Sequence, residues 1–311
     1  MTVASIAVFG SVNIDVTAFC VHLPRPGETV SGRKYSMTLG GKGANQAVAA
    51  ARLGAHASLV GRTGTDAFGA LARERLGAYG VELDRLHAQP EAATGIAVIN
   101  VDSRAENTIV VIGGANMMVD ATDVERALPL LAAAQVLLLQ LEVPLAATLT
   151  AAACTRAAGG QVVLDPAPAP AGGLPTSVYA TVDMVTPNET ETEALVGVRP
   201  QTPADAARAA ALLHERGVRT AIIKMGAAGV FFDGPDGSGF VPPFPVTAIN
   251  SVGAGDCFNG GLAFGLAQGR ALPDAVRFAA ACGALATTGP GGAASAPTIA
   301  DVEKLLGRGV T

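Results

Sequence analysis

Short apolar runs alternate with longer Ala- and Leu-rich segments along most of this 311-residue chain. The apolar runs have the character of buried strands and lie at residues 5–9, 57–60, 136–141, 162–165, 183–186 and 220–224. The segments between them predict helices, most of which end at a glycine, at residues 43–52, 67–76, 121–134, 145–158 and 203–216. Such alternation produces right-handed βαβ units. The sequence therefore predicts an α/β fold with a doubly wound, mainly parallel sheet and helices on both faces.

Two segments interrupt this alternation, at about 14–40 and 94–113. The second reads as paired strands, Gly95–Asn100 and Thr108–Ile112, on either side of a polar turn. We expect both segments to form a small β-sheet lid. No internal repeat or linker divides the chain, so we expect a single α/β domain over residues 1–311.

The charge and hydropathy of the chain argue against nucleic acids and membranes as partners. The formal net charge is −5 and no run of Lys or Arg is present, so a polyanion would find no basic surface. The most apolar stretch, residues 127–141, is interrupted by Pro129 and two glutamines and is shorter than the ~20 apolar residues of a spanning helix. The N-terminus lacks a basic signal region, and the four cysteines form no CxxC pair. We expect a cytoplasmic protein.

Polar residues follow five of the predicted strands. They lie at Gly10–Asn13, Gln140–Glu142, Asp165–Pro166, Thr186–Glu189 and Lys224–Gly226. The carboxyl ends of parallel strands share one edge of the sheet, where ligands of such folds bind. We therefore expect a polar site at that edge.

The segment Gly253-Ala254-Gly255-Asp256 precedes an apolar helical pattern over residues 258–267. Small residues let the backbone approach a ligand closely, and the free N–H groups of a helix start attract phosphate. Phe258 stands where a dinucleotide fingerprint needs glycine, and the segment is no Walker A loop. The alternative role for Asp256 is a plain helix cap.

The segment Gly40–Asn45 also carries glycines around one lysine. Gly43, not Ser or Thr, follows Lys42, which excludes a Walker A loop. Asn45 has donors and an acceptor that could hold a vicinal diol. The alternative is a flexible loop with a solvated lysine.

Three further side chains suit sugar hydroxyls. Asn13 and Asp15 share one face if the chain is extended, although an Asx turn would explain them too. Glu142 ends an apolar run and could accept another hydroxyl hydrogen bond.

Asn188 and Glu191 form either a capping box or a water-mediated Mg²⁺ site.

Together these segments resemble the ribokinase (PfkB-type) carbohydrate kinase family over almost the whole chain. Leu23–Val30 leading into Gly40–Ala47 is similar to the first family signature, and Gly253–Asp256 is similar to the second. Gln140–Glu142 and Thr186–Glu191 match in the same order. The resemblance implies a ribokinase-like α/β core and a homodimer formed through the β-lid.

The resemblance also implies roles for individual residues, with Asp256 as the catalytic base. The sugar would be bound by Asn13, Asp15, Gly41, Lys42, Gly43, Asn45, Glu142 and Asp256. The ATP site would be lined by Asn188, Lys224, Gly226, Gly229, Gly253, Ala254 and Gly255. Asn188 and Glu191 would hold Mg²⁺ through water. Lys224 stands where ribokinases often have Thr, so it either adds a phosphate contact or caps its strand.

A monovalent cation, K⁺, is implied near the second signature. Its ligands would be Asn250, Val252, Ala286, Gly289, Gly291 and Ser295. Ribokinases usually have Asp where this chain has Asn250. Because the amide lacks the fixed negative charge, we expect K⁺ to bind more weakly than in typical relatives.

The activity implied is ATP-dependent phosphorylation of the primary hydroxyl of a small sugar, with D-ribose converted to ribose 5-phosphate. Deoxyribose, a keto-sugar acid, fructose or a nucleoside are alternative substrates within the family. Three Tyr and no Trp leave little to stack a nucleobase, which favours a furanose. A sugar sensor without activity would be expected to lose the base or the glycine loop, and both are present.

Overall fold

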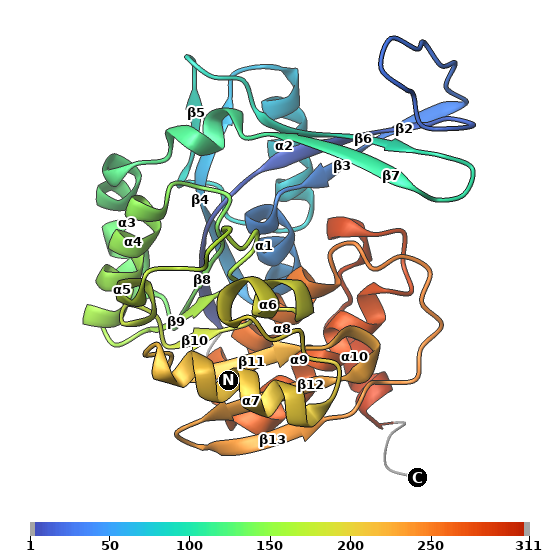
Figure 1. Cartoon of the computed structure of the whole chain (residues 1–311). Coiled ribbons are helices and arrows are strands. Elements are labelled where there is room, and N and C mark those ends of the chain that lie inside the picture. The colour runs from blue at the N-terminus through green and yellow to red at the C-terminus, as the bar shows by residue number, and fades with distance from the viewer. Residues whose placement is uncertain (1–3, 308–311) are drawn as a thin grey trace.

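The computed structural model describes residues 4–307; residues 1–3 and 308–311 of the predicted domain lie outside the described part. A nine-stranded sheet runs through the centre of the molecule in the order β13-β12-β11-β10-β9-β8-β1-β4-β5 (Figure 1). Its strands are β1 (Ser5–Phe9), β4 (His56–Gly64), β5 (Leu86–Gln89), β8 (Val136–Leu139), β9 (Gln161–Leu164), β10 (Met184–Val185), β11 (Thr220–Lys224), β12 (Val230–Gly234) and β13 (Gly237–Val241).

Pairing from β11 to β5 is parallel throughout, which confirms the predicted doubly wound sheet. Phe9 at the end of β1 lies in register with Val60 of β4 and Leu139 of β8. The hairpin β12–β13 adds an antiparallel edge that the sequence pattern did not predict.

Helices cover both faces of the sheet, as predicted. Because successive strand residues point to opposite faces, Ile6 and Val8 of β1 enter one core, and Ala7 and Phe9 enter the other. The first core is formed with α1 (Lys42–Arg52), α2 (Ala67–Ala78), α8 (Ala254–Ala267), α9 (Leu272–Ala286) and α10 (Ile299–Gly307). The second is formed with α3 (Ala121–Ala133), α4 (Leu145–Ala157), α5 (Thr176–Tyr179), α6 (Glu189–Val196) and α7 (Pro203–Glu215). Short 3₁₀ turns are η1 (Gly114–Met118), η2 (Gly226–Ala228) and η3 (Gly292–Ser295). No helix in residues 4–307 is long and apolar enough to cross a membrane.

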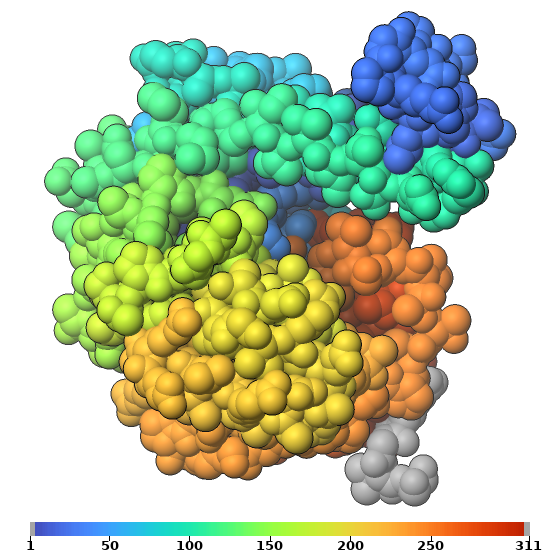
Figure 2. Space-filling view, viewed as in Figure 1, coloured from blue at the N-terminus to red at the C-terminus, as the bar shows by residue number. Residues whose placement is uncertain are grey.

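A separate four-stranded sheet forms the lid, with strand order β3-β2-β6-β7. Its strands are β2 (Asn13–Phe19), β3 (Lys34–Gly40), β6 (Gly95–Val101) and β7 (Asn107–Ile112). They extend away from the helices and the central sheet, and the space-filling view is hollowed beneath them (Figures 1 and 2). Both predicted lid segments contribute to this sheet. The edge strand β7 leaves four apolar side chains exposed, Ile109, Val110, Val111 and Ile112.

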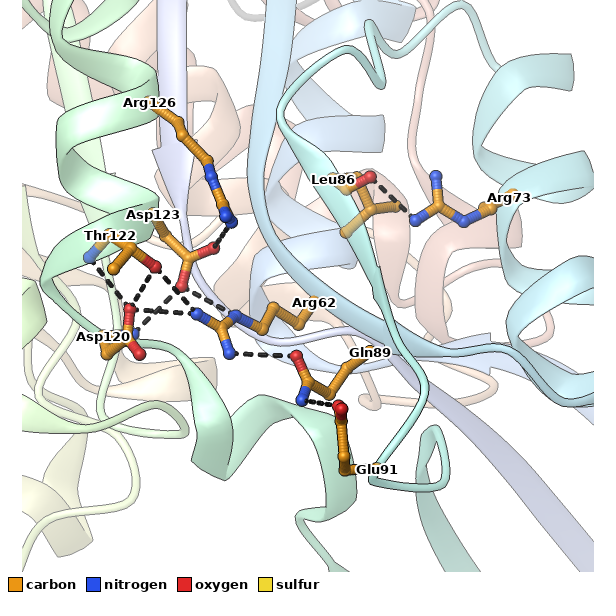
Figure 3. A network of polar contacts seen from close by, with 9 residues as sticks. All are labelled: Arg62, Arg73, Leu86, Gln89, Glu91, Asp120, Thr122, Asp123 and Arg126. Atoms are coloured by element: carbon orange, nitrogen blue, oxygen red, sulfur yellow. Dashed lines mark hydrogen bonds and ion pairs between the residues drawn. The ribbon is translucent and has the colours of Figure 1, made fainter.

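A buried arginine ties the central sheet to α3. Arg62 of β4 donates from Nε to Asp123 Oδ2 at 2.8 Å and from Nη2 to Asp120 Oδ1 at 2.9 Å (Figure 3). Arg62 Nη1 also donates to Gln89 Oε1 at 3.1 Å. The Asp123 side chain is fully buried, whereas that of Asp120 is half exposed. Asp123 is therefore the principal charge that keeps the Arg62 guanidinium compensated inside the protein.

Asp123→Ala is expected to destabilise the protein by about 3 kcal/mol, because removal of one partner leaves a buried charge poorly compensated. Urea denaturation followed by circular dichroism measures the change in the free energy of unfolding. Glu125→Ala, at an exposed position on the same helix, is the control and should change that energy by less than about 0.5 kcal/mol. Equal stability of the two variants would show that the network contributes nothing.

Candidate active site

Asp256 lies buried at the start of α8, beside the carboxyl ends of the central strands. Asn45 Nδ2 of α1 donates to Asp256 Oδ2 at 3.0 Å, and Gln46 Nε2 donates to Asp256 Oδ1 at 3.2 Å. Asp256 is the third residue of α8, and no side chain caps that helix among the described residues. The carboxylate is thus fixed by α1 and does not cap its own helix.

A chain of polar side chains extends from Asp256 toward β9 and β11. Gln46 Nε2 also donates to Asp165 Oδ2 at 3.1 Å, and Gln140 Nε2 donates to Gln46 Oε1 at 2.6 Å. Lys224 Nζ donates to the other oxygen of Asp165 at 3.1 Å. Sequence reasoning assigned no role to Gln46, Gln140 or Asp165. The sequence signals available for them were the positions of Gln140 and Asp165 at the ends of predicted strands and the position of Gln46 in the first signature.

The predicted loop at Gly40–Asn45 is not flexible, because α1 begins at Lys42. Gly41 has a φ of 85°, and a Cβ there would lie 2.8 Å from the backbone nitrogen of Asn13, so only glycine fits. Gly43 packs equally closely against the backbone of Gly10 and Ser11. The predicted sugar contact at Gly43 thus coincides with a packing requirement.

Glu142 binds the start of α1. Its Oε2 accepts hydrogen bonds from the Lys42 backbone N–H at 2.9 Å and from Ser11 Oγ at 2.5 Å. Ser11 was not predicted as a site residue. Glu142 therefore holds the glycine-rich turn in place, in addition to the hydroxyl contact that we predicted for it.

Asn13 and Asp15 lie at the lid side of the site, on β2. Asn13 Oδ1 accepts from Asn116 Nδ2 at 2.7 Å, and Asn116 also bonds both backbone groups of Val12. Asn116, in η1, is a further residue that the sequence did not indicate. Asp15 accepts no side-chain hydrogen bond within the described residues, which leaves its carboxylate available to a ligand.

The carboxylates of the site influence one another. Burial raises the pKa of Asp256 to about 6; Lys42 opposes the rise and Asp165 adds to it. Burial also raises the pKa of Asp15 to about 6, with further contributions from Glu142 and Asp256. Burial alone would lower the pKa of Lys42, but four surrounding carboxylates raise it above its ordinary value. Lys42 is therefore a fixed positive charge among acids.

Asn188 and Glu191 form a reciprocal capping box at the start of α6. Asn188 Oδ1 accepts from the Glu191 N–H at 2.9 Å, and Glu191 Oε2 accepts from the Asn188 N–H at 2.8 Å. Burial raises the pKa of Glu191, while the nearby Lys224 opposes the rise. The predicted metal role thus falls on residues that also cap a helix, and a contact through water would leave the cap intact.

Lys224 and the glycines at 253 and 255 are predicted nucleotide residues that lie together at the start of α8. Gly253 has a φ of 82°, and a Cβ there would lie 2.9 Å from Gly292 Cα. Lys224 Nζ lies 3.4 Å from the position that a Cβ on Gly255 would occupy. Gly226 is the first residue of η2, shortly after β11, and Gly229 follows its last residue. Glycine amides, a helix N-terminus and a lysine therefore meet at one place that suits phosphate.

The predicted cation ligands lie in the loop before α8 and in the segment from the last residue of α9 to the end of η3. Four of the oxygens already accept hydrogen bonds: Asn250 Oδ1 from Val252 N, Val252 O from Gly292 N, Ala286 O from Gly289 N and Ser295 Oγ from Gly291 N. A carbonyl oxygen keeps a second lone pair, so these residues still permit a cation, but none of them carries a negative charge.

Comparison with known proteins gives the class to which this fold and site belong. Residues 3–299 match the family described as pfkB family carbohydrate kinase, and the chain belongs to that family.

Individual relatives agree with this class. The chain is 37% identical over 294 residues to the ribokinase of Haemophilus influenzae, covering 94% of this chain and 95% of that protein. It is 34% identical to the deoxyribokinase of Salmonella typhi, covering 97% and 98%. The structure of Arabidopsis thaliana ribokinase complexed with ribose and ATP superposes with a TM-score of 0.89 at 32% identity, covering 98% of this chain and 99% of that one.

Proposed function

We propose that this carbohydrate kinase transfers the γ-phosphoryl group of ATP to the primary hydroxyl of D-ribose, giving ribose 5-phosphate. The observation that carries the proposal is Asp256: a buried carboxylate, held by Asn45 and Gln46, at a glycine-rich helix start. Ribokinases that are 34–37% identical over most of this chain support the choice of sugar.

Asp256 accepts the proton of the attacking hydroxyl as the new P–O bond forms and the bond to the leaving ADP oxygen breaks. Asn45 and Gln46 fix both carboxylate oxygens, so the base is oriented before the sugar binds. The amides of Gly253–Gly255 and the Lys224 ammonium stabilise the charge on the transferring group.

The sugar is bound between the lid and α1. Asn45 Oδ1 is buried and has no partner in the described structure, so it can accept a ring hydroxyl. Asp15 offers a carboxylate from the lid side of the sugar, and Lys42 offers a positive charge from the α1 side. The deoxyribokinase relative makes 2-deoxyribose the second candidate substrate.

In this proposal the nucleotide is bound by Asn188, Lys224, Gly226, Gly229 and Gly253–Gly255. Asn188 and Glu191 hold Mg²⁺ through water, and the ion neutralises phosphate charge when bound. K⁺ binds the carbonyl oxygens between the loops weakly, since Asn250 contributes no charge. The protein acts in the cytoplasm.

A homodimer forms through the lid, because the exposed row Ile109–Ile112 on the edge strand β7 is suited to pairing with a second copy. Sedimentation equilibrium of Val110→Lys against the unaltered protein checks this. A monomer in the unaltered protein would contradict it.

The pH dependence of kcat/KM should show an acid limb with an apparent pKa near 6. Asp256 and Asp15 must be ionised, and burial raises both pKa values to about 6. Below pH 6 the rate should fall by at least about tenfold per pH unit, and above it the rate should be level. Initial rates from pH 4.5 to 8 measure the profile; a rate still level at pH 5 would contradict the assignment.

An ADP-release assay over pentoses, hexoses and nucleosides tests the substrate. We expect the highest kcat/KM for D-ribose, followed by 2-deoxyribose. Turnover of nucleosides alone would overturn the proposed substrate, and the absence of turnover on every sugar would overturn the proposed activity.

A further inference from the structure

The Asn250 carboxamide joins the loop before α8 to the loop after α9. Its Nδ2 donates to the Pro290 carbonyl oxygen at 2.7 Å, and its Oδ1 accepts from the Val252 N–H at 2.9 Å. The Pro290 carbonyl oxygen requires a donor and the Val252 N–H requires an acceptor, so only one orientation of the Asn250 amide satisfies both contacts.

Backbone contacts reinforce the same connection. The N–H groups of Ile249 and Asn250 both donate to Thr287 O, at 2.7 and 3.0 Å, and the Gly292 N–H donates to Val252 O at 2.8 Å. Gly253 packs on Gly292 so closely that a Cβ would not fit. The segment that leads into Gly253–Asp256 is therefore held directly by protein groups.

A carboxylate at position 250 could make only one of the two side-chain contacts. It has only acceptor oxygens, so one could still accept from Val252 N–H, while the other would face the Pro290 carbonyl oxygen. Two oxygens with no proton between them repel each other. A cation bound between them would remove the repulsion, whereas the Asn250 N–H removes it without one.

We infer that Asn250 is a positioning residue that keeps the phosphate-binding loop organised without a monovalent cation, so that K⁺ is dispensable for phosphoryl transfer. Asp at this position would make the loop depend on K⁺. This inference rests on the proposed function where rates are concerned, and it also predicts the stability of the loop in the protein without substrate.

The unaltered protein and two variants, Asn250→Asp and Asn250→Ala, are compared in KCl, NaCl and tetramethylammonium chloride at equal ionic strength. One readout is ADP release with ribose and Mg·ATP. The other is hydrogen–deuterium exchange of the 249–256 segment in the substrate-free protein.

The unaltered protein should show less than about twofold variation in rate among the three salts, and equal exchange protection in each. Asn250→Asp should lose about tenfold or more in rate and lose protection in tetramethylammonium, and recover both in KCl. Asn250→Ala, which lacks both bonds, should be slow and exchange fast in every salt.

A rate in the unaltered protein that rises more than about tenfold with K⁺, or an Asn250→Asp variant indifferent to the salt in both readouts, would overturn the inference. Exchange is measured without substrate, so an inactive protein would contradict the proposed function while the exchange data still decided the role of Asn250. If Asn250→Asp does not fold in any salt, unequal exchange of the unaltered protein among the salts would overturn the inference, and equal exchange would support it.

Discussion

Asp256→Asn is expected to lower kcat by about 10²–10⁴-fold, the range associated with general-base catalysis, while the KM for ribose changes little. The variant keeps the size and buried position of the side chain. One of its atoms becomes an NH₂ group that cannot accept a proton and that must face the donor of Asn45 or Gln46. Binding should survive because the remaining sugar contacts are unchanged.

Steady-state rates and calorimetric titration with ribose separate these effects. Asp274→Asn, at the third residue of α9 and exposed, provides a matched control that should leave kcat unchanged. A near-normal kcat in Asp256→Asn would remove Asp256 from the role of base. Loss of sugar binding together with rate would assign it to binding instead.

Lys224→Met is expected to lower kcat by about 10²–10³-fold, as the loss of one group that stabilises transition-state charge typically does. The ammonium lies against Gly255 and forms an ion pair with the buried Asp165 at 3.1 Å. Its removal takes away a positive charge near the transferring phosphoryl group, and it also leaves the Asp165 carboxylate without its counter-charge.

The double variant Asp165→Asn/Lys224→Met distinguishes these two causes. It restores the charge balance without restoring the ammonium, so it should stay as slow as Lys224→Met if Lys224 acts on phosphate. Recovery of the rate in the double variant would show that Lys224 serves only to neutralise Asp165. Lys304→Met, at an exposed position of α10, controls for loss of a lysine elsewhere.

The central sheet and its helices were predictable because buried apolar strands that alternate with long Ala- and Leu-rich segments are compatible with few fold classes. The edge hairpin β12–β13 was missed since its strands are short, glycine-rich and only partly buried. The 220–224 run was correctly assigned as a strand, because it is a short apolar run whose residues are almost all buried, between the parallel β10 and the antiparallel β12.

A special backbone position was predictable where one residue type has few uses, as at Gly253, whose φ of 82° favours glycine. Gln46 lies in the first signature but gained no role from it, and Asn116 had no sequence signal, because the role of each amide depends on partners 94 or more residues away along the chain. Glu142 was expected to contact a hydroxyl, and only the folded chain reveals its two bonds to Ser11 and Lys42.

The most direct test of the proposed chemistry is a ³¹P NMR spectrum of the product formed from D-ribose and Mg·ATP. We predict a new phosphomonoester resonance coupled to the two C5 protons of ribose, growing as ADP appears, and absent when Asp256→Asn replaces the unaltered protein on the same time scale. Release of inorganic phosphate alone, or a phosphate coupled to the C1 proton, would contradict the account.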